Sequence, residues 1–166
     1  MRFLACFLFS ISMTLSGMVY AQTMQTQPTS SFAPLPANHP LNDPDLSTFR
    51  ELINNTGVYN LFQGTGPFTA FVPSNAAMEK YGRAKLVELK KPKNEDQLTD
   101  LLLYHVVPGK YLTQYIKPET VRTINGKTLT LGKNGTEVRV NNARIIKADL
   151  EGPNGVVHII DTVLTP

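Results

Sequence analysis

The fold is decided by the last stretch of the chain, NGVVHIIDTVLTP (Asn154–Pro166). A turn dipeptide opens it, and an apolar run broken only by His158 extends to the first charge at Asp161. Such a run is typical of a strand buried on both faces rather than one at a sheet edge. Because successive side chains of a strand alternate between its faces, His158 and Asp161 point to opposite sides.

Each face of this strand therefore carries one polar side chain. A buried imidazole or carboxylate without a hydrogen-bond partner costs about 1–3 kcal/mol or more. Segments elsewhere in the chain must therefore supply hydrogen-bond partners for His158 and Asp161.

Length and composition indicate one globular domain with appendages, because 42% of the 166 residues are hydrophobic. In residues 1–21, Arg2 precedes an apolar run, and Val19-Tyr20-Ala21 suits cleavage after Ala21. We expect a signal peptide rather than a membrane anchor, since the run is short for a bilayer span of about 20 residues. Residues 22–40 are rich in Gln, Thr, Ser and Pro and are expected to form a flexible tether before a domain at 41–166.

The only cysteine, Cys6, lies within the predicted signal peptide. A secreted chain, periplasmic or extracellular, would then contain no disulfide despite an oxidising compartment, and its stability must come from its core. The net charge of +3 falls to about +2 without Arg2, which is too small to indicate nucleic-acid binding. No transmembrane anchor is predicted after residue 21.

Helical patterns dominate the first half of the domain. Asp43 and Pro44 suit the start of a helix, and apolar side chains recur at helical spacing from residue 46 to 53 and from 58 to 62. Residues 68–72 have the pattern of a strand, and Ser74 is suited to cap a helix that Gly82 ends. Asn94 and Gln97 resemble a capping box for a further helix, which residues 106–109 break.

The periodicity changes after Lys117. Short β-branched runs alternate with Asn125-Gly126, Asn134-Gly135 and Asn141-Asn142, a pattern that predicts a β-meander with type I′ turns. Helices, one strand, more helices and then a meander indicate an α+β fold rather than βαβ repeats.

Three segments resemble the signatures of fasciclin-like domains. They are FTAFVPSNAA (68–77), LYHVVPG (103–109) and NGVVHIID (154–161), in the family's order and spacing. The resemblance covers roughly residues 45–166 and implies a wedge with a β-sandwich-like core and flanking short helices. It further implies a secreted or surface-attached adhesion module, of the single-domain kind found in bacteria. A family helix before residue 45 is replaced by the proline-rich segment 32–36, so the N-terminal edge of the core is expected to be covered differently or left open.

The resemblance assigns a structural role to a small set of signature residues. They are Phe71, Pro73, Asn75, His158 and Asp161. Because the first and last signatures would be neighbouring pieces of one core, we expect Asn75, Thr69 or backbone groups to pair with His158 and Asp161.

Two pairs of residues are candidates for ligand contact. The resemblance implies an integrin-contacting role for Tyr104-His105, although His105 shares an apolar helical face and is better explained by a buried hydrogen bond. Asp149-Leu150 matches part of a second adhesion motif, but Glu151 places a charge where that motif is apolar.

A basic segment provides an alternative that is independent of the resemblance. Its cations are Lys80, Arg83, Lys85, Lys90, Lys91 and Lys93. Such a run could bind an acidic polysaccharide or anionic lipid, although most charge runs are solvated helix faces.

Catalysis, metal binding and cofactor binding are not expected. No serine lies in a nucleophile-elbow context, and the histidines at 39, 105 and 158 have no second ligand at zinc-type spacing. Asn54 and Asn134 begin N-glycosylation sequons. The sequence thus predicts a non-catalytic adhesion or interaction module that recognises a cell-surface or matrix protein or polysaccharide, with self-association as a further possibility.

Overall fold

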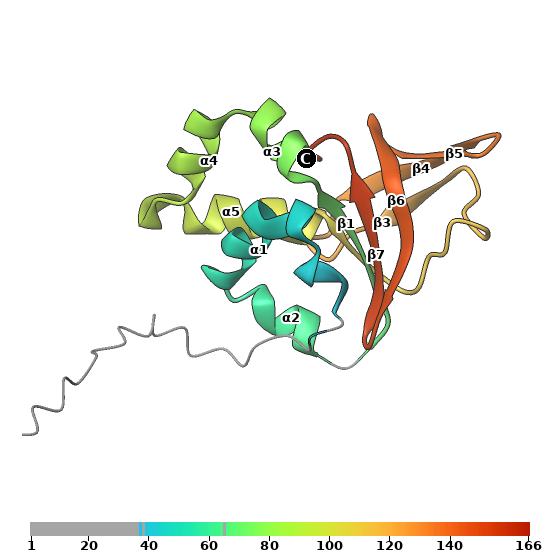
Figure 1. Cartoon of the computed structure of the whole chain (residues 1–166), viewed down its shortest axis with the longest axis horizontal. Helices are drawn as coiled ribbons and strands as arrows, with labels where there is room; N and C mark the ends of the chain where they lie inside the picture. Colours follow the sequence, from blue (N-terminus) through green and yellow to red (C-terminus); the bar gives the residue numbers. More distant parts are fainter. Residues whose placement is uncertain (1–36, 38, 65) are drawn as a thin grey trace, which may run out of the picture.

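Seven strands form one strongly curled sheet in the order β2-β1-β7-β6-β5-β4-β3 in the computed structural model, which describes residues 37, 39–64 and 66–166 (Figure 1). The strands are β1 (Phe68–Pro73), β2 (Val106–Pro108), β3 (Glu119–Arg122), β4 (Thr128–Asn134), β5 (Glu137–Val140), β6 (Ala143–Gly152) and β7 (Gly155–Ile160). The backbone N–H of Ile124 donates to the Val106 carbonyl oxygen at 2.9 Å, so the two ends of the sheet nearly meet.

Strand β7 is an interior strand of this sheet rather than an edge strand, as the sequence predicted. It pairs in parallel with β1 over the whole of Phe68–Pro73 and antiparallel with β6. Its residues from Val156 to Ile160 are all buried. The chains approach so closely that a Cβ on Gly155 would lie 2.0 Å from the Phe68 carbonyl oxygen, so only glycine fits there.

Short helices cover one face of the β1–β7 region (Figure 1). They are α1 (Ser47–Asn54), α2 (Tyr59–Gln63), α3 (Asn75–Tyr81), α4 (Arg83–Leu89) and α5 (Glu95–Tyr104), with single 3-10 turns at Pro40–Asn42, Pro44–Leu46 and Pro92–Asn94. This combination with the curled sheet confirms the predicted α+β class.

Local capping rules succeeded at two helix starts and failed at a third. The Asp43 carboxylate accepts from the Asp45 N–H, and the Ser74 hydroxyl accepts from the Ala77 N–H. Gly82 ends α3 with φ at 112°. The predicted capping box was wrong, because the Asn94 amide instead donates to the Glu88 carbonyl oxygen of the preceding helix.

The predicted turn type was also wrong. A type I′ turn needs positive φ at both central residues, but at the two Asn-Gly pairs only Gly126 and Gly135 have it. Gly135 is instead the first residue of the two-residue β4–β5 connection, where a type II′ turn needs positive φ. Asn141 takes positive φ (51°) in the next connection.

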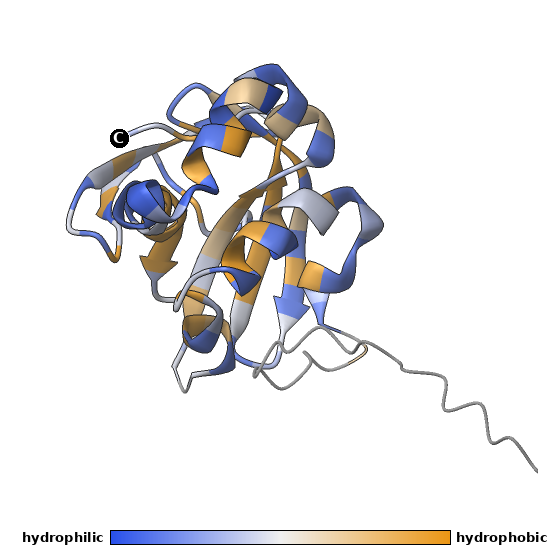
Figure 2. Ribbon diagram, turned by 90° about the vertical axis from the view of Figure 1, so that its left-hand side faces the viewer, coloured by the Kyte–Doolittle hydropathy of each residue, from blue (hydrophilic) through white to orange (hydrophobic). Residues whose placement is uncertain are grey.

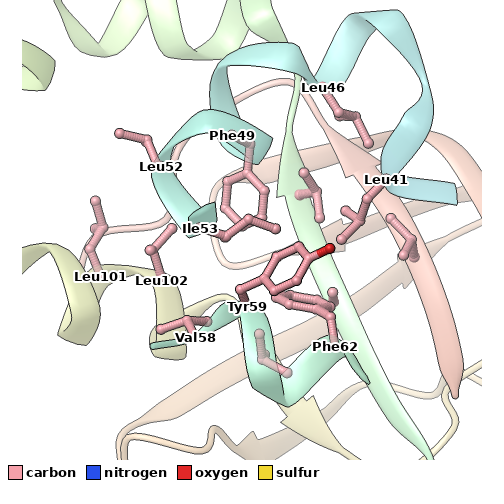
Figure 3. Close-up of a cluster of buried hydrophobic side chains, with 14 of the residues drawn as sticks. Leu41, Leu46, Phe49, Leu52, Ile53, Val58, Tyr59, Phe62, Leu101 and Leu102 are labelled. Atoms are coloured by element: carbon pink, nitrogen blue, oxygen red, sulfur yellow. The ribbon is translucent and has the colours of Figure 1, made fainter. Parts of the chain in front are cut away.

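Two hydrophobic clusters lie on opposite faces of β7. Val157 and Ile159 belong to the cluster under the helices, and Ile160 belongs to the cluster enclosed by the curled sheet. Figure 3 shows how side chains of α1, α2 and α5 converge in the helix-side cluster, and Figure 2 shows hydrophobic strands between more hydrophilic helix surfaces. The terminal strand is therefore the wall shared by both cores.

The N-terminal edge of the helix-side cluster is covered by the 3-10 turn at Pro40–Asn42. Leu41 is fully buried in that cluster, and His39, only 4% exposed, accepts the Leu41 N–H. Pro40 lies against Gly152 of β6. Packing of the domain thus begins about two residues before the predicted boundary at 41, whereas the predicted signal peptide and most of the predicted tether lie outside the described residues.

Candidate functional site

His158 connects three distant segments at the centre of the sheet. Its Nε2–H donates to the Tyr111 carbonyl oxygen at 2.7 Å, and its Nδ1 accepts from the Asp149 N–H at 3.1 Å. A carbonyl on one side and an N–H on the other require the neutral ring with its proton on Nε2. The ring is fully buried and stacks on Phe71 with centroids 5.5 Å apart, and this burial lowers the pKa of His158.

His105 makes an equivalent connection at the end of α5. Its Nδ1–H donates to the Leu101 carbonyl oxygen at 2.7 Å, and its Nε2 accepts from the Leu164 N–H at 3.1 Å. Complete burial lowers the pKa of His105 to about 4. Both ring nitrogens of His105 thus have backbone partners inside the core.

Asp161 closes the end of β7 onto β6. Its Oδ1 accepts from the Arg144 N–H at 2.9 Å, and its own N–H donates to the Arg144 carbonyl oxygen at 3.0 Å. Burial opposes ionisation, but the Arg144 N–H, the Thr162 hydroxyl and nearby cations hold the pKa of Asp161 below its usual value. The carboxylate thus helps to hold the end of β7 against the start of β6.

Backbone groups are the partners that were expected for His158 and Asp161, whereas the two proposed side chains serve other segments. Asn75 accepts from the Thr48 N–H and donates to the Pro44 carbonyl oxygen, which fastens α3 to the start of α1. Thr69 donates to the Gly109 carbonyl oxygen at 2.7 Å and accepts from the Tyr111 N–H at 2.9 Å. The alternative in which the Asn75 or Thr69 side chain pairs with His158 or Asp161 was therefore wrong.

The connection between β2 and β3, residues 109–118, is fixed at several points, and we call it the pinned loop. Thr69 and His158 hold its first residues. Further along, the Thr113 N–H donates to Asp149 Oδ1 at 2.8 Å, the Thr113 hydroxyl donates to Asp149 Oδ2, and Lys133 donates to the Thr113 carbonyl oxygen. These contacts give an irregular segment a defined conformation.

Tyr115 stands out from the pinned loop with 71% of its surface exposed. The sequence analysis missed this residue; the available signal was an aromatic side chain in a polar, proline-ended connection. Because the loop backbone on its N-terminal side is held by β1, β6 and β7, this exposed ring sits on a rigid support.

Asp149 lies beside the pinned loop on an irregular part of β6. The β6–β7 register shifts twice between Ile145 and Leu150, and Asp149 has φ at 55°. A non-glycine residue with positive φ is uncommon and requires support from its surroundings, which here comes from His158 and Thr113. Asp149 is exposed but engaged by the loop, whereas Leu150 packs against the helix-side cluster.

Tyr104 is also enclosed, with only 4% of its surface exposed. Its hydroxyl donates to the Thr128 carbonyl oxygen at 3.0 Å and accepts from the Asn141 amide at 3.1 Å. The Tyr104-His105 pair therefore faces the core, and neither side chain is presented to a partner at the surface.

Four of the six cations of the basic segment form exposed ion pairs with nearby acids. The ion pairs are Arg83–Glu79, Lys90–Glu51, Lys91–Glu88 and Lys93–Glu88, at 2.5–3.0 Å. Lys85 lies 5.3 Å from the centre of the Tyr81 ring, and Lys80 is near enough to Asp161 to affect its ionisation. These pairs reduce the positive field that an acidic polysaccharide or lipid would meet.

The titratable groups give no support for catalysis in the part of the chain that the structure describes. Both nitrogens of His105 and of His158 are occupied by backbone groups, and His39 Nδ1 accepts from Leu41. Across the same described ranges, no three His, Cys, Asp or Glu side chains are grouped to hold a metal ion. Likewise, none of the described helices has the length and hydropathy needed to cross a bilayer.

Comparison with known proteins identifies the family. A fasciclin domain model matches residues 44–166. The chain belongs to the fasciclin domain family. Among curated relatives, protein sll1483 of Synechocystis is 35% identical over 72% of this chain and 67% of its own length. Periostin of Homo sapiens is 32% identical over 74% of this chain but only 15% of its own length.

The fold comparison agrees with this assignment. A FAS1 domain pair from the insect cell adhesion molecule Fasciclin I superposes with a TM-score of 0.59 and 24% identity, over 74% of this chain and 46% of that chain. A bacterial fasciclin relative, the immunogenic protein MPB70 of Mycobacterium bovis, is 32% identical over 75% of this chain and 65% of its own length. The observed fold is therefore that of a FAS1 domain.

Proposed function

We propose that this fasciclin domain is an exported, non-catalytic adhesion module that binds a cell-surface or matrix protein or polysaccharide. Support comes from its family and from its likeness in fold to a cell adhesion molecule. The observation that carries the proposal is the pinned loop, which presents an exposed Tyr115 on a rigid sheet.

The pinned loop has the physical properties of a recognition surface. Thr69, Asp149 and His158 already fix the loop backbone, so the loop does not have to become ordered when it binds a partner. Such preorganisation lowers the entropic cost of association. Tyrosine is enriched among the residues that dominate binding energy, since its ring is apolar and its hydroxyl forms hydrogen bonds. Tyr115 is the proposed anchor, with Asp149 beside it.

Retention of the mature chain on outer-surface material tests this function. Beads carrying many copies of residues 22–166 are incubated with cell-surface or matrix extract, because one weak contact gains strength through multiplicity. Retention is expected to persist at 0.5 M NaCl, whereas contacts through the basic segment would be screened. We expect Tyr115→Ala to lose most of the retention.

Ile146→Ala is the matched control, because Ile146 is another large exposed hydrophobic residue, on β6. Both variants should melt within about 2 °C of the parent chain, since neither side chain is buried. Equal retention of the parent and Tyr115→Ala, or complete loss at high salt, would refute the proposed surface. Loss at high salt together with loss in Lys90→Ala would favour the polyanion alternative.

A further inference from the structure

A cavity of about 570 Å³ has neither Tyr115 nor Asp149 among its described lining residues. It lies between α2, the start of β1, the second half of α5 and the connection that follows β3. Figure 3 shows α2 and α5 facing each other, with Val58 between them. Its volume falls within the range of about 300–1,000 Å³ that is usual for small-molecule pockets.

Apolar side chains make up most of the lining. They include Val58, Leu61, Phe68, Leu103, Pro108 and Ile124. Ile124, one of these lining residues, is among the few large hydrophobic residues that are exposed in the described part of the chain. Since apolar surface left in water is unfavourable, covering this patch would stabilise a complex.

The polar part of the lining restricts the chemistry of a ligand further. No Asp, Glu, Lys, Arg or His is among the described residues that line the cavity. Among those described lining residues, the polar side chains are those of Asn60 and Thr99, and neither side chain forms a hydrogen bond with another described group. A charged ligand would lose its hydration without a compensating partner, whereas an uncharged one with a hydroxyl or carbonyl could use these two groups.

We propose that this cavity binds an uncharged, largely apolar small molecule that carries one or two hydrogen-bonding groups. The lining residues come from several elements of the fold, and the cavity is present in the structure as described. The site is separate from the pinned loop and makes this chain a carrier or sensor of an apolar compound in addition to an adhesion module. Among possible occupants, a small molecule matches the volume, the uncharged lining and the pair of unused polar side chains together.

N-phenyl-1-naphthylamine is a suitable uncharged probe, because its fluorescence rises in apolar surroundings. Titration of the mature chain should show saturable binding of one probe per chain. The anionic probe anilinonaphthalene sulfonate should bind at least about tenfold more weakly, because its charge finds no partner in the lining. Equal binding of both probes, or no saturable binding of the uncharged one, would overturn the proposal.

A filled-pocket variant identifies the site. Thr99 is a half-buried residue of α5 in the lining, so Thr99→Trp should occupy the cavity and weaken probe binding at least tenfold. Val87→Trp places the same side chain at an exposed position of α4 and should leave binding unchanged. The parent chain contains no tryptophan, so each variant reports its own environment, and equal affinity of Thr99→Trp and the parent would refute the assignment.

Two further readouts distinguish a small-molecule pocket from a groove for the N-terminal segment and from the adhesion surface. A chain that begins at Ala37 should bind the probe as the mature chain does. Tighter binding by the shorter chain would show that residues 22–36 compete for the cavity and would overturn the choice of a small molecule. Beads that carry Thr99→Trp should be retained on surface or matrix extract as the parent chain is, because this retention depends on Tyr115. A wrong pocket assignment can thus be distinguished from a wrong adhesion surface.

Discussion

Replacing His158 by alanine should destabilise the domain more than any single surface change. The substitution removes the acceptor of the Asp149 N–H and the donor to the Tyr111 carbonyl oxygen, both at a fully buried ring. It also removes the aromatic surface that stacks on Phe71. The irregular part of β6 around Asp149 and the start of the pinned loop both lose their hydrogen bonds to β7.

The magnitude follows from these contacts. Each buried backbone group left without a partner costs about 1–3 kcal/mol, and losing the stacked ring adds about 1 kcal/mol. Water that reaches the unpaired Asp149 N–H and Tyr111 carbonyl oxygen reduces the total of these costs. We therefore expect a loss of about 4 kcal/mol in the free energy of unfolding. For a domain of about 125 residues this corresponds to a fall in Tm of roughly 10–15 °C.

Urea and thermal unfolding, both followed by far-UV circular dichroism, measure this loss. The method does not require tryptophan, which the chain lacks. Lys91→Ala is the control, because Lys91 forms only an exposed pair with Glu88, and such pairs contribute about 0–1 kcal/mol. Equal melting temperatures for His158→Ala and Lys91→Ala would refute the reasoning that the imidazole is architectural. A loss of function in His158→Ala at unchanged stability would point instead to a chemical role.

Three further predictions follow from the same geometry. The pKa of His105 is about 4 in the fold and about 6.5 in the unfolded chain. The neutral imidazole therefore contributes about 3 kcal/mol to the free energy of unfolding above pH 6.5, and this contribution is lost as the pH falls towards 4. The lowered pKa of His158 acts in the same direction, and a urea midpoint that stays constant from pH 7.5 to 4.5 would contradict both. Gly155→Ala should prevent stable folding because its Cβ would overlap β1, whereas Gly132→Ala, with open space around its Cβ, should fold normally by circular dichroism. Asp149→Ala should make residues 110–118 more susceptible to limited proteolysis, and cleavage as slow as in the parent would show that the loop does not need this carboxylate.

Sequence patterns predicted the elements that depend on local rules. The Ser74 cap, the Gly82 stop and the buried terminal strand all follow from residues within one or two turns or one strand of each other. They hold because a cap, a positive φ or an apolar run imposes similar constraints in most folds. The α+β class followed from the order of these elements.

The remaining features depend on contacts between distant residues. Val106–Pro108 was interpreted as a helix break, yet it is a strand because β1, almost forty residues earlier, offers its edge. The positive φ of Asp149 and the rigidity around Tyr115 also depend on partners that no local pattern names. An exposed aromatic residue in a loop, such as Tyr115, gains its significance only from the strands that fix the loop backbone.

Two neutral imidazoles act in this fold as cross-links that do not depend on oxidation. His158 joins β7 to a residue 47 positions earlier, and His105 joins α5 to a residue 59 positions later. No cysteine follows Cys6 in the sequence, so no disulfide can restrain these segments. Each ring offers one donor and one acceptor in the same plane, which lets it satisfy a carbonyl and an N–H from different segments.

The same property makes the cross-links sensitive to acid, because protonation removes the acceptor and introduces a charge into the core. Sensitivity to low pH is therefore a direct consequence of building both cores around histidine.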